Sequence, residues 1–315
     1  MTTIRLSGSS EQLGHVSQAG EFSLWDEEWL RQGAKTELVT SLGRSSLILD
    51  ALEYEPFPDG EARASFVEKD DFALGREDSK HGVRFGQLII NGKGIHESPD
   101  FVAMKSFDDE SELKNEWALN QHLNGVFDDQ YAFLPLGVYA DKDKNLSMVT
   151  AYEHQVQSLD NIFWADPSLE PEALRPATVR RAMAMGFLAL GMLHGARVIH
   201  HDAQVKNMAT GRNGVRFIDL EDAEVLHPDE IDDPYVVDKT RSDISSFITS
   251  AGQVIENKEP VAAAIGSAKQ RAHMYGQYRQ GVRVGRASQD GTFVPNFERI
   301  NRDYIYDQID KAIKP

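Results

Sequence analysis

The sequence predicts an α+β protein of two lobes, with a β-rich first lobe that carries one helix and a mainly helical second lobe. Three observations support this prediction. Short β-rich runs bounded by glycines dominate residues 62–152. One helical segment with an N-terminal capping signal interrupts them at 109–125, and long helical segments follow residue 176. Because strands gather in one stretch and helices in the next, we expect two packed halves that meet near Thr150–His154.

Composition limits the classes of protein to consider. The 315 residues suffice for one large domain or two modest ones, and 41% hydrophobic with 26% charged residues is ordinary for a globular protein. A net charge of −17 argues against non-specific binding to nucleic acid or to an anionic membrane. The absence of cysteine excludes disulfides and thiolate metal sites.

No segment of the sequence has the pattern of a membrane or export signal. The N-terminus lacks the basic region and apolar run of a secretory signal. The longest uncharged run, Ala182–Ala196, is shorter than the roughly 20 apolar residues that a spanning helix needs. We therefore expect a cytoplasmic protein without a membrane partner, and a helix at this run that is buried nearly all round.

The chain divides into four expected regions, which are an N-terminal extension (1–60), a first lobe (61–152), the core of a second lobe (153–255) and a C-terminal helical extension (256–315). The N-terminal extension has candidate helices at 23–33 and 36–52. In the first lobe, Asp109 and Glu112 form the pattern of a capping box, and Gly125 is typical of a helix stop. Strands are expected at 62–74, 83–90, 101–107, 133–140 and 146–152, with a turn at Asn91-Gly92. In the second lobe, helices are expected at 158–166 and from Pro176 to Gly195.

The stretch "VIHHDAQVKNMATGRNGVRFIDLED" contains the strongest chemical signal. "NMAT" and "VRFIDL" predict two strands joined by the turn "GRNG". Such a hairpin would bring Asn207 and Asp219 to one edge, with Asp202 in the loop just before. Oxygen ligands of this kind suit Mg²⁺ held against phosphates. A zinc site would need other spacings, and a glycosidase pair would not explain the asparagine.

Upstream, "VAMK" places Lys105 on a strand, and the following helix carries Glu112 and Glu116. A strand lysine in a cleft is a point charge for phosphate oxygens, and a glutamate on the next helix can hold it in place. Glu112 and Glu116 share a helix face, so both are candidates for this role. Glu116, in the string "NEWAL", is the preferred one of the two on the family resemblance that the motifs together carry.

These motifs together resemble the protein-kinase-like superfamily over residues 65–255. The resemblance rests on "VAMK", on Glu116, on "HHDAQVKN", on "IDLE" and on "TRSDISSFI", which carries Asp243. It implies a bilobal fold with a small antiparallel β-sheet and one helix in the N-lobe and a mainly helical C-lobe. It also implies ATP and Mg²⁺ as cofactors, with nucleotide contacts from the hinge at Thr150, Ala151, Tyr152 and Glu153.

The resemblance assigns a role to each matching residue. Asp202 would accept or orient the proton of the attacking hydroxyl, while Asn207 and Asp219 would hold the metal. Lys105 would pair the phosphates, with Glu116 fixing its position. His194 and His200 match structural positions, and His201 stands where an arginine is usual.

Departures from the family pattern favour a small-molecule or other non-peptide acceptor. His201 removes the usual partner of an activation-loop phosphate, and Gln204 replaces a phosphate-contacting lysine. "IDLE", with Glu221, is similar to strings in choline and aminoglycoside-type phosphotransferases. No A-P-E motif follows Asp219. An atypical serine/threonine protein kinase, an inactive pseudokinase that binds nucleotide, and a nucleotidyl transferase remain as alternatives.

Two further segments give expectations. No G-x-G-x-x-G precedes "VAMK", and Gly75–Gly82 is the best candidate for a loop over the phosphates. The basic segment 269–286, with Lys269 to Arg286, has no acidic residue. It is a solvated helix face or a dock for an anionic partner, in which Tyr275 and Tyr278 could stack on nucleic acid.

Overall fold

The chain forms two compact units, each with its own internal packing. Unit 1 comprises Met1–Gly125 and Phe133–Gln155, and unit 2 comprises Val126–Ala132 and Val156–Pro315. In this computed structural model the described residues are 34–40, 43–49, 62–68, 82–90, 93–94, 101–127, 135–140, 146–152, 157–159, 176–211, 214–227, 234–254, 258–287 and 297–313.

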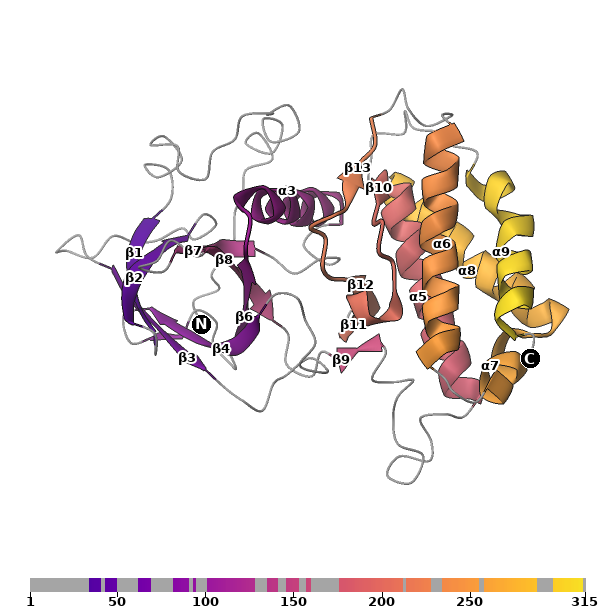
Figure 1. The fold of residues 1–315 in the computed structure, drawn as a ribbon, viewed down its shortest axis with the longest axis horizontal. Coiled ribbons are helices and arrows are strands. Elements are labelled where there is room, and N and C mark those ends of the chain that lie inside the picture. The colour runs from indigo at the N-terminus through magenta and orange to yellow at the C-terminus, as the bar shows by residue number, and fades with distance from the viewer. Residues whose placement is uncertain are drawn as a thin grey trace. The chain divides into compact units, whose positions relative to one another are not determined.

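Unit 1 contains one sheet in which eight strands follow the order β3-β1-β2-β7-β8-β6-β4-β5 (Figure 1). An additional pairing of β3 with β4 joins the two sides of this sheet, so seven of the strands form a closed ring. All neighbouring strands are antiparallel except β1 and β3, which are parallel. The strands are β1 Ala34–Thr40, β2 Gly43–Leu49, β3 Ala62–Glu68, β4 Val83–Ile90, β5 Lys93–Gly94, β6 Phe101–Phe107, β7 Pro135–Ala140 and β8 Leu146–Tyr152.

The sheet confirms the strands that the sequence predicts in this region and corrects two expectations. The strands expected at 83–90, 101–107 and 146–152 are present with these bounds. The helix expected at 36–52 is wrong, because β1 and β2 pair with each other there and β2 pairs with β7, far along the chain. The expected antiparallel sheet is present, with the correction that one of its pairs, β1 with β3, is parallel. The segment 23–33 and the turn 91–92 lie outside the described residues.

Helix α3, Glu110–Val126, is the described helix of unit 1, and Asp109 caps its N-terminus. The Asp109 carboxylate accepts hydrogen bonds from the backbone N–H and the hydroxyl of Ser111, at 2.6 and 2.7 Å. These bonds hold the pKa of Asp109 below its usual value, since they favour the charged form. The apolar face of α3 is buried at Leu113, Trp117 and Leu123. The cap and this face fix the register of the helix.

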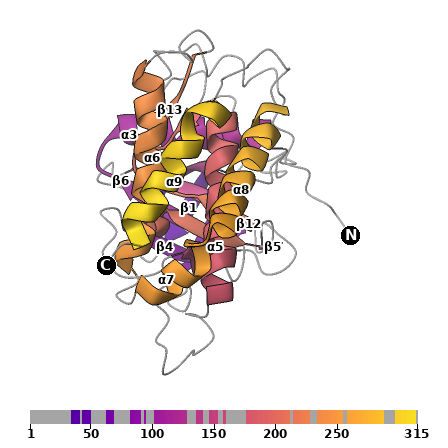
Figure 2. The same cartoon turned by 90° about the vertical axis from the view of Figure 1, so that its right-hand side faces the viewer.

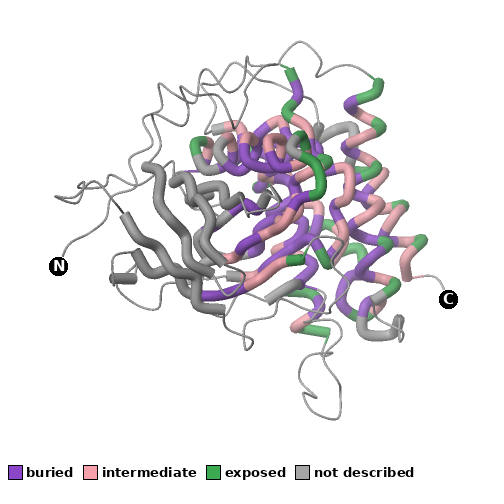
Figure 3. The backbone as a smooth tube through the Cα atoms, turned by 60° about the vertical axis from the view of Figure 1, so that its left-hand side comes forward, coloured by how far each residue is buried: buried purple, intermediate pink, exposed green. Residues whose placement is uncertain are grey.

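Unit 2 is mainly helical, with small two- and three-stranded sheets at one side. Buried and exposed positions alternate along its helices, as Figure 3 shows. Helices α6 and α9 lie side by side in Figures 1 and 2. The helices are α5 Pro176–Gly195, α6 Pro234–Val254, α7 Lys258–Ile265, α8 Ala268–Ala287 and α9 Phe297–Ile313. The strands are β9 Gln157–Ser158, β10 Val198–Ile199, β11 Met208–Gly211, β12 Gly214–Phe217 and β13 Glu224–Val225, and η2 Val205–Asn207 is a short 3-10 turn.

Two predictions for unit 2 are confirmed. Helix α5 has the predicted bounds, and the run Ala182–Ala196 is buried at most of its positions. Strands β11 and β12 form the predicted antiparallel hairpin, with Met208 opposite Phe217. The segment 158–166, which was expected to be helical, lies outside the described residues apart from its first two positions.

Glycines allow helices α5 and α8 to pack with their backbones in contact. A Cβ atom on Gly191 of α5 would overlap the carbonyl oxygen of Tyr278, and one on Gly281 of α8 would overlap the carbonyl oxygen of Leu188. Gly195 and Gly285 approach the opposite helix in the same way. Because a side chain at any of these positions would separate the two helices, glycine is required for this close approach.

Among the described residues, no helix combines the length and the apolar character that crossing a membrane requires.

The close approach of α5 and α8 generates a prediction for Gly281. Gly281→Ala should lower the free energy of unfolding by about 1–3 kcal/mol, because its methyl group overlaps the backbone of α5. Gly276→Ala on the same helix is the matched control, since a Cβ there meets nothing within 4 Å. The control should be neutral or more stable by up to about 1 kcal/mol. Urea unfolding measures both, and equal stabilities would contradict the close approach.

Candidate active site

In unit 1, an ion pair joins the strand lysine to the following helix. The Nζ atom of Lys105 on β6 lies 2.6 Å from Oε2 of Glu116 on α3. Both side chains are largely buried, with 13% and 6% exposed. The ammonium also lies 4.9 Å from the centre of the Phe107 ring. Partial burial strengthens the attraction and holds the ammonium in one place, where it can act as a fixed positive charge.

The register of α3 determines which of the two candidate glutamates reaches the lysine. Glu116 makes the ion pair, and its position on the helix is supported by Asn120, whose side-chain nitrogen donates to the backbone oxygen of Glu116 at 2.9 Å. Asn120 is buried. The buried side-chain nitrogen of Asn120 therefore has its hydrogen-bond acceptor within the same helix.

The expected hinge residues follow in β8. The hydroxyl of Thr150 donates to the backbone oxygen of Ala103 at 3.4 Å, and Ala151 and Tyr152 lie opposite Val102 and Phe101 on β6. Glu153 lies outside the described residues, as does the candidate phosphate loop Gly75–Gly82 apart from Gly82.

In unit 2, the loop between β10 and β11 holds Asp202 through both of its carboxylate oxygens. The side-chain nitrogen of Asn207 donates to Oδ2 at 2.9 Å and to the Asp202 backbone oxygen at 3.0 Å, and Gln204 donates to Oδ1 at 2.5 Å. The Lys206 ammonium lies 3.5 Å from Oδ2. Because the amide nitrogen of Asn207 faces Asp202, its amide oxygen points to the other side and is oriented to bind a cation.

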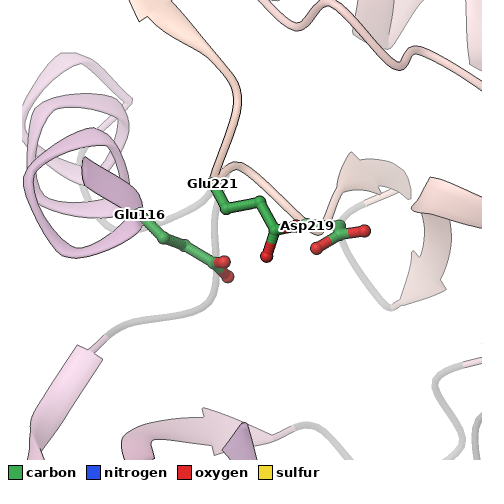
Figure 4. Close-up of side chains that lie close together, drawn as sticks. All are labelled: Glu116, Asp219 and Glu221. Atoms are coloured by element: carbon green, nitrogen blue, oxygen red, sulfur yellow. The ribbon is translucent and has the colours of Figure 1, made fainter. Parts of the chain in front are cut away.

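Two carboxylates stand on the segment that follows β12. Asp219 has a left-handed backbone, with φ of 65°, and Figure 4 draws Asp219 and Glu221 on this segment and Glu116 on helix α3. A carboxylate oxygen of Asp219 and one of Glu221 lie within 4.8 Å of each other. Like charges this close favour a bound cation. Oxygen donors from Asn207, Asp219 and Glu221 fit Mg²⁺, which prefers hard oxygen ligands. Glu221 of the "IDLE" string is an additional candidate ligand, beyond the Asn207 and Asp219 that the sequence predicts.

A backbone bond ties these two parts of unit 2 together. The N–H of Ile218 donates to the backbone oxygen of Asn207 at 2.9 Å. The residue before Asp219 is thus fixed directly to Asn207, which also holds Asp202. The structure therefore brings Asn207 into contact with Asp202 and with the residue that precedes Asp219.

The histidines before Asp202 have structural contacts. His200 is fully buried, its Nε2 donates to the backbone oxygen of Ile218 at 3.1 Å, and its Nδ1 accepts from the Asp202 N–H at 3.3 Å. Burial lowers the pKa of His200 below its usual value, with the neighbouring carboxylate of Asp243 opposing this effect. A neutral ring fits these two contacts.

The buried carboxylate of Asp243 on α6 anchors the same loop. Its Oδ2 accepts from the His200 N–H at 2.8 Å and its Oδ1 from the His201 N–H at 2.9 Å. His201, which has a left-handed φ of 66°, places its Nε2 3.0 Å from Glu224 on β13. The side chain in the usual arginine position thus has a carboxylate partner within the chain.

The basic segment lies on helix α8, and the structure corrects one part of its expected role. Tyr278 is fully buried and its hydroxyl lies 2.8 Å from Nδ1 of His194, so it cannot stack on a nucleic acid. Tyr275 packs edge-on against Tyr306. Arg271 forms an ion pair with Asp310 on α9.

Comparisons with known proteins add little to this picture. No protein-family model matches the chain, and no curated protein matches it. Among solved structures, the chain is similar to the kinase domain of a rhoptry antigen from Toxoplasma gondii, with 12% sequence identity and a TM-score of 0.43. This similarity covers 94% of the present chain and 92% of the other. At this identity and TM-score the similarity carries no conclusion about the family or the activity of the chain.

The buried ring of His200 generates a prediction for stability in acid. Its folded pKa lies below the unfolded value of 6.5, so below that pH the unfolded chain binds a proton that the folded protein does not. This group therefore leaves the free energy of unfolding unchanged above pH 6.5 and lowers it as the pH falls toward the folded pKa. The decrease is at most about 1.4 kcal/mol per pH unit.

Urea unfolding at about pH 7.5 and about pH 5.5 measures this effect. His200→Gln should lose less stability between the two pH values than the wild type does. His273→Gln, at an exposed position of α8, is the control. An acid-induced loss that is the same in all three proteins would show that His200 does not contribute.

Proposed function

We propose that this protein is an ATP- and Mg²⁺-dependent phosphotransferase that moves the γ-phosphoryl group to a hydroxyl of a small molecule or another non-peptide acceptor. The observation that carries the proposal is the double role of Asn207 in unit 2. Its side chain holds the carboxylate of Asp202, and its backbone oxygen holds the segment that leads into Asp219. One residue thus fixes the distance between a candidate base and a candidate metal ligand.

Asp202 is the group that handles the acceptor proton. In the transfer, the acceptor oxygen forms a bond to the γ-phosphorus while the bond from that phosphorus to the β-phosphate bridging oxygen breaks, and ADP leaves. The acceptor proton passes to Asp202. Hydrogen bonds from Asn207 and Gln204 orient this carboxylate, which lowers the cost of placing it correctly against the acceptor.

Asn207, Asp219 and Glu221 supply the oxygen atoms that would hold Mg²⁺. When bound, the metal neutralises charge on the nucleotide phosphates, which is the main electrostatic demand of phosphoryl transfer. The backbone at Asp219 is left-handed, so its side chain leaves the backbone in a different direction from that of a β-strand residue.

Lys105 supplies the positive charge for the phosphates, and Glu116 keeps its ammonium in place. The backbone of β8 at Thr150–Tyr152 is the proposed adenine contact, because an extended strand end presents N–H and C=O groups to a purine edge.

Two features favour a non-peptide acceptor over a peptide. His201 has the Glu224 carboxylate as its partner within the chain, at 3.0 Å, so its contact does not depend on a phosphorylated side chain. The chain from Asp219 to Asp243 contains no A-P-E motif and has little length for a peptide-docking platform. An atypical protein kinase is one alternative. An inactive nucleotide-binding module is another, and the experiments below separate it from the proposal.

Binding of magnesium ATP generates the first prediction from this proposal. Saturating ATP with Mg²⁺, at about 100 times the dissociation constant, should stabilise the folded protein by about 2.7 kcal/mol, and a thermal-shift assay measures the change. Asp219→Asn should remove most of the shift with Mg²⁺ present, and Lys105→Met should reduce it. Asp222→Asn, at an exposed position three residues from Asp219, is the matched control and should keep the full shift. No shift in the wild type would contradict nucleotide binding.

Loss of turnover without loss of binding is the prediction for Asp202. Asp202→Asn should lower the rate of phosphoryl transfer, or of ATP hydrolysis with water as acceptor, by about 10²–10⁴-fold. Its thermal shift with magnesium ATP should remain, because Asp202 is not a proposed metal ligand. Product mass distinguishes transfer of a phosphoryl group from transfer of a nucleotidyl group. A wild-type protein that binds ATP but never turns it over would instead support an inactive nucleotide-binding module.

A further inference from the structure

We infer that Tyr278 of helix α8 is a positioning residue, which holds the loop carrying Asp202 through His194 and Asp243. The inference rests on the proposed function for its catalytic meaning. Tyr278 lies in the part of the chain beyond the family resemblance, and neither the motifs nor the comparisons give it a role. Tyr278, His194, Asp243 and the loop all lie within unit 2.

Four contacts connect this hydroxyl to the loop, and the last two both start from Asp243. The Tyr278 hydroxyl lies 2.8 Å from Nδ1 of His194, and Nε2 of His194 lies 3.2 Å from Oδ2 of Asp243. Asp243 in turn accepts the backbone N–H groups of His200 and His201. The side chains of Tyr278, His194 and Asp243 are fully buried, so water does not compete for these bonds.

The hydrogen-bonding capacity of each group determines which atom donates and which accepts in each of these bonds. The Asp243 carboxylate accepts from both backbone N–H groups, so Nε2 of His194 must carry the proton that faces it. In the neutral ring, Nδ1 is then an acceptor, and the Tyr278 hydroxyl is its donor. The Tyr278 hydroxyl therefore satisfies Nδ1 of His194 while Nε2 donates to Asp243.

Loss of this hydroxyl would loosen the imidazole ring. Without it, Nδ1 is left as an unsatisfied acceptor inside the core, and the ring loses the bond that holds it in place on that side. A shift of the ring would weaken the bond from Nε2 to Oδ2 of Asp243. Since the same oxygen accepts the His200 N–H, a shift of the carboxylate moves the backbone next to Asp202.

The helix packing explains why a tyrosine of α8 can reach this network. Gly191 of α5 brings the backbone of α8 into direct contact at Tyr278, three residues before His194. The ring of Tyr278 then packs edge-on against the imidazole, with centroids 5.7 Å apart. Helix α8 thus contributes a group to the loop that the region 153–255 cannot supply by itself.

Tyr278→Phe tests the inference, because it removes the hydroxyl and leaves the ring. The first measurement is amide hydrogen exchange over residues 198–207, which should become about tenfold faster because two bonds to Asp243 weaken. The second is hydrolysis of magnesium ATP with water as acceptor. We expect kcat to fall about tenfold while KM for ATP stays within about twofold, since nucleotide contacts are unchanged.

Tyr275→Phe is the matched control, one turn earlier on the same helix. Its ring packs against Tyr306 on α9 and is only partly buried. Exchange over 198–207 and kcat should both equal those of the wild type. Unchanged exchange in Tyr278→Phe would overturn the inference. So would faster exchange spread evenly over all of unit 2, since that pattern would mean a general loss of stability.

A second variant tests whether Tyr278 acts through His194. In a His194→Gln background, adding Tyr278→Phe should change exchange and kcat by less than about twofold, because the connection is already broken. Full additivity of the two substitutions would overturn the inference. If His194→Gln does not fold, the comparison of Tyr278→Phe with Tyr275→Phe decides the matter. A wild-type protein without ATP hydrolysis would contradict the proposed function alone, because the exchange measurement still decides whether Tyr278 positions the loop.

Discussion

The hydrogen bonds of the buried Asp243 carboxylate are the interactions on which the loop carrying Asp202 depends. A carboxylate without exposure to water is costly unless hydrogen bonds satisfy it, and here three N–H donors do so. Two of the three belong to the backbone just before Asp202. Satisfying Asp243 therefore also fixes the loop, including the left-handed conformation of His201, which an L-residue adopts only when its surroundings require it.

In unit 1 a single charge pair has the corresponding role. Lys105 and Glu116 come from a strand and a helix, so their contact depends on the strand register and on the point where α3 begins. Asp109 sets that starting point through its bonds to Ser111. A helix displaced by one residue would turn Glu116 by about 100° away from the lysine. The cap is therefore part of what determines the position of the ammonium.

The net charge of the chain affects how these residues could bind an anionic ligand. With a net charge of −17, the protein repels free anions in general, so a triphosphate needs local positive charge to bind. Lys105 provides one such charge, and a cation attracted by Asp219 and Glu221 would provide more. For the proposed function, the acidity of the chain is thus a second reason, beside the types of ligand, to expect a bound metal ion.

The sequence by itself determined the local features. The strand 101–107 and the helix 176–195 depend on patterns of nearby residues, and their bounds agree with the structure. The cap at Asp109 and the hairpin after Asn207 also form, although the hairpin strands are Met208–Gly211 and Gly214–Phe217. Tertiary structure decided the rest. Residues 43–49 form strand β2, which pairs with β1 and with β7, about 90 residues later. Tyr278 is buried because glycines on two helices far apart in sequence allow their backbones to touch. Such contacts depend on which segments meet in space, and residue spacing along the chain does not contain that information.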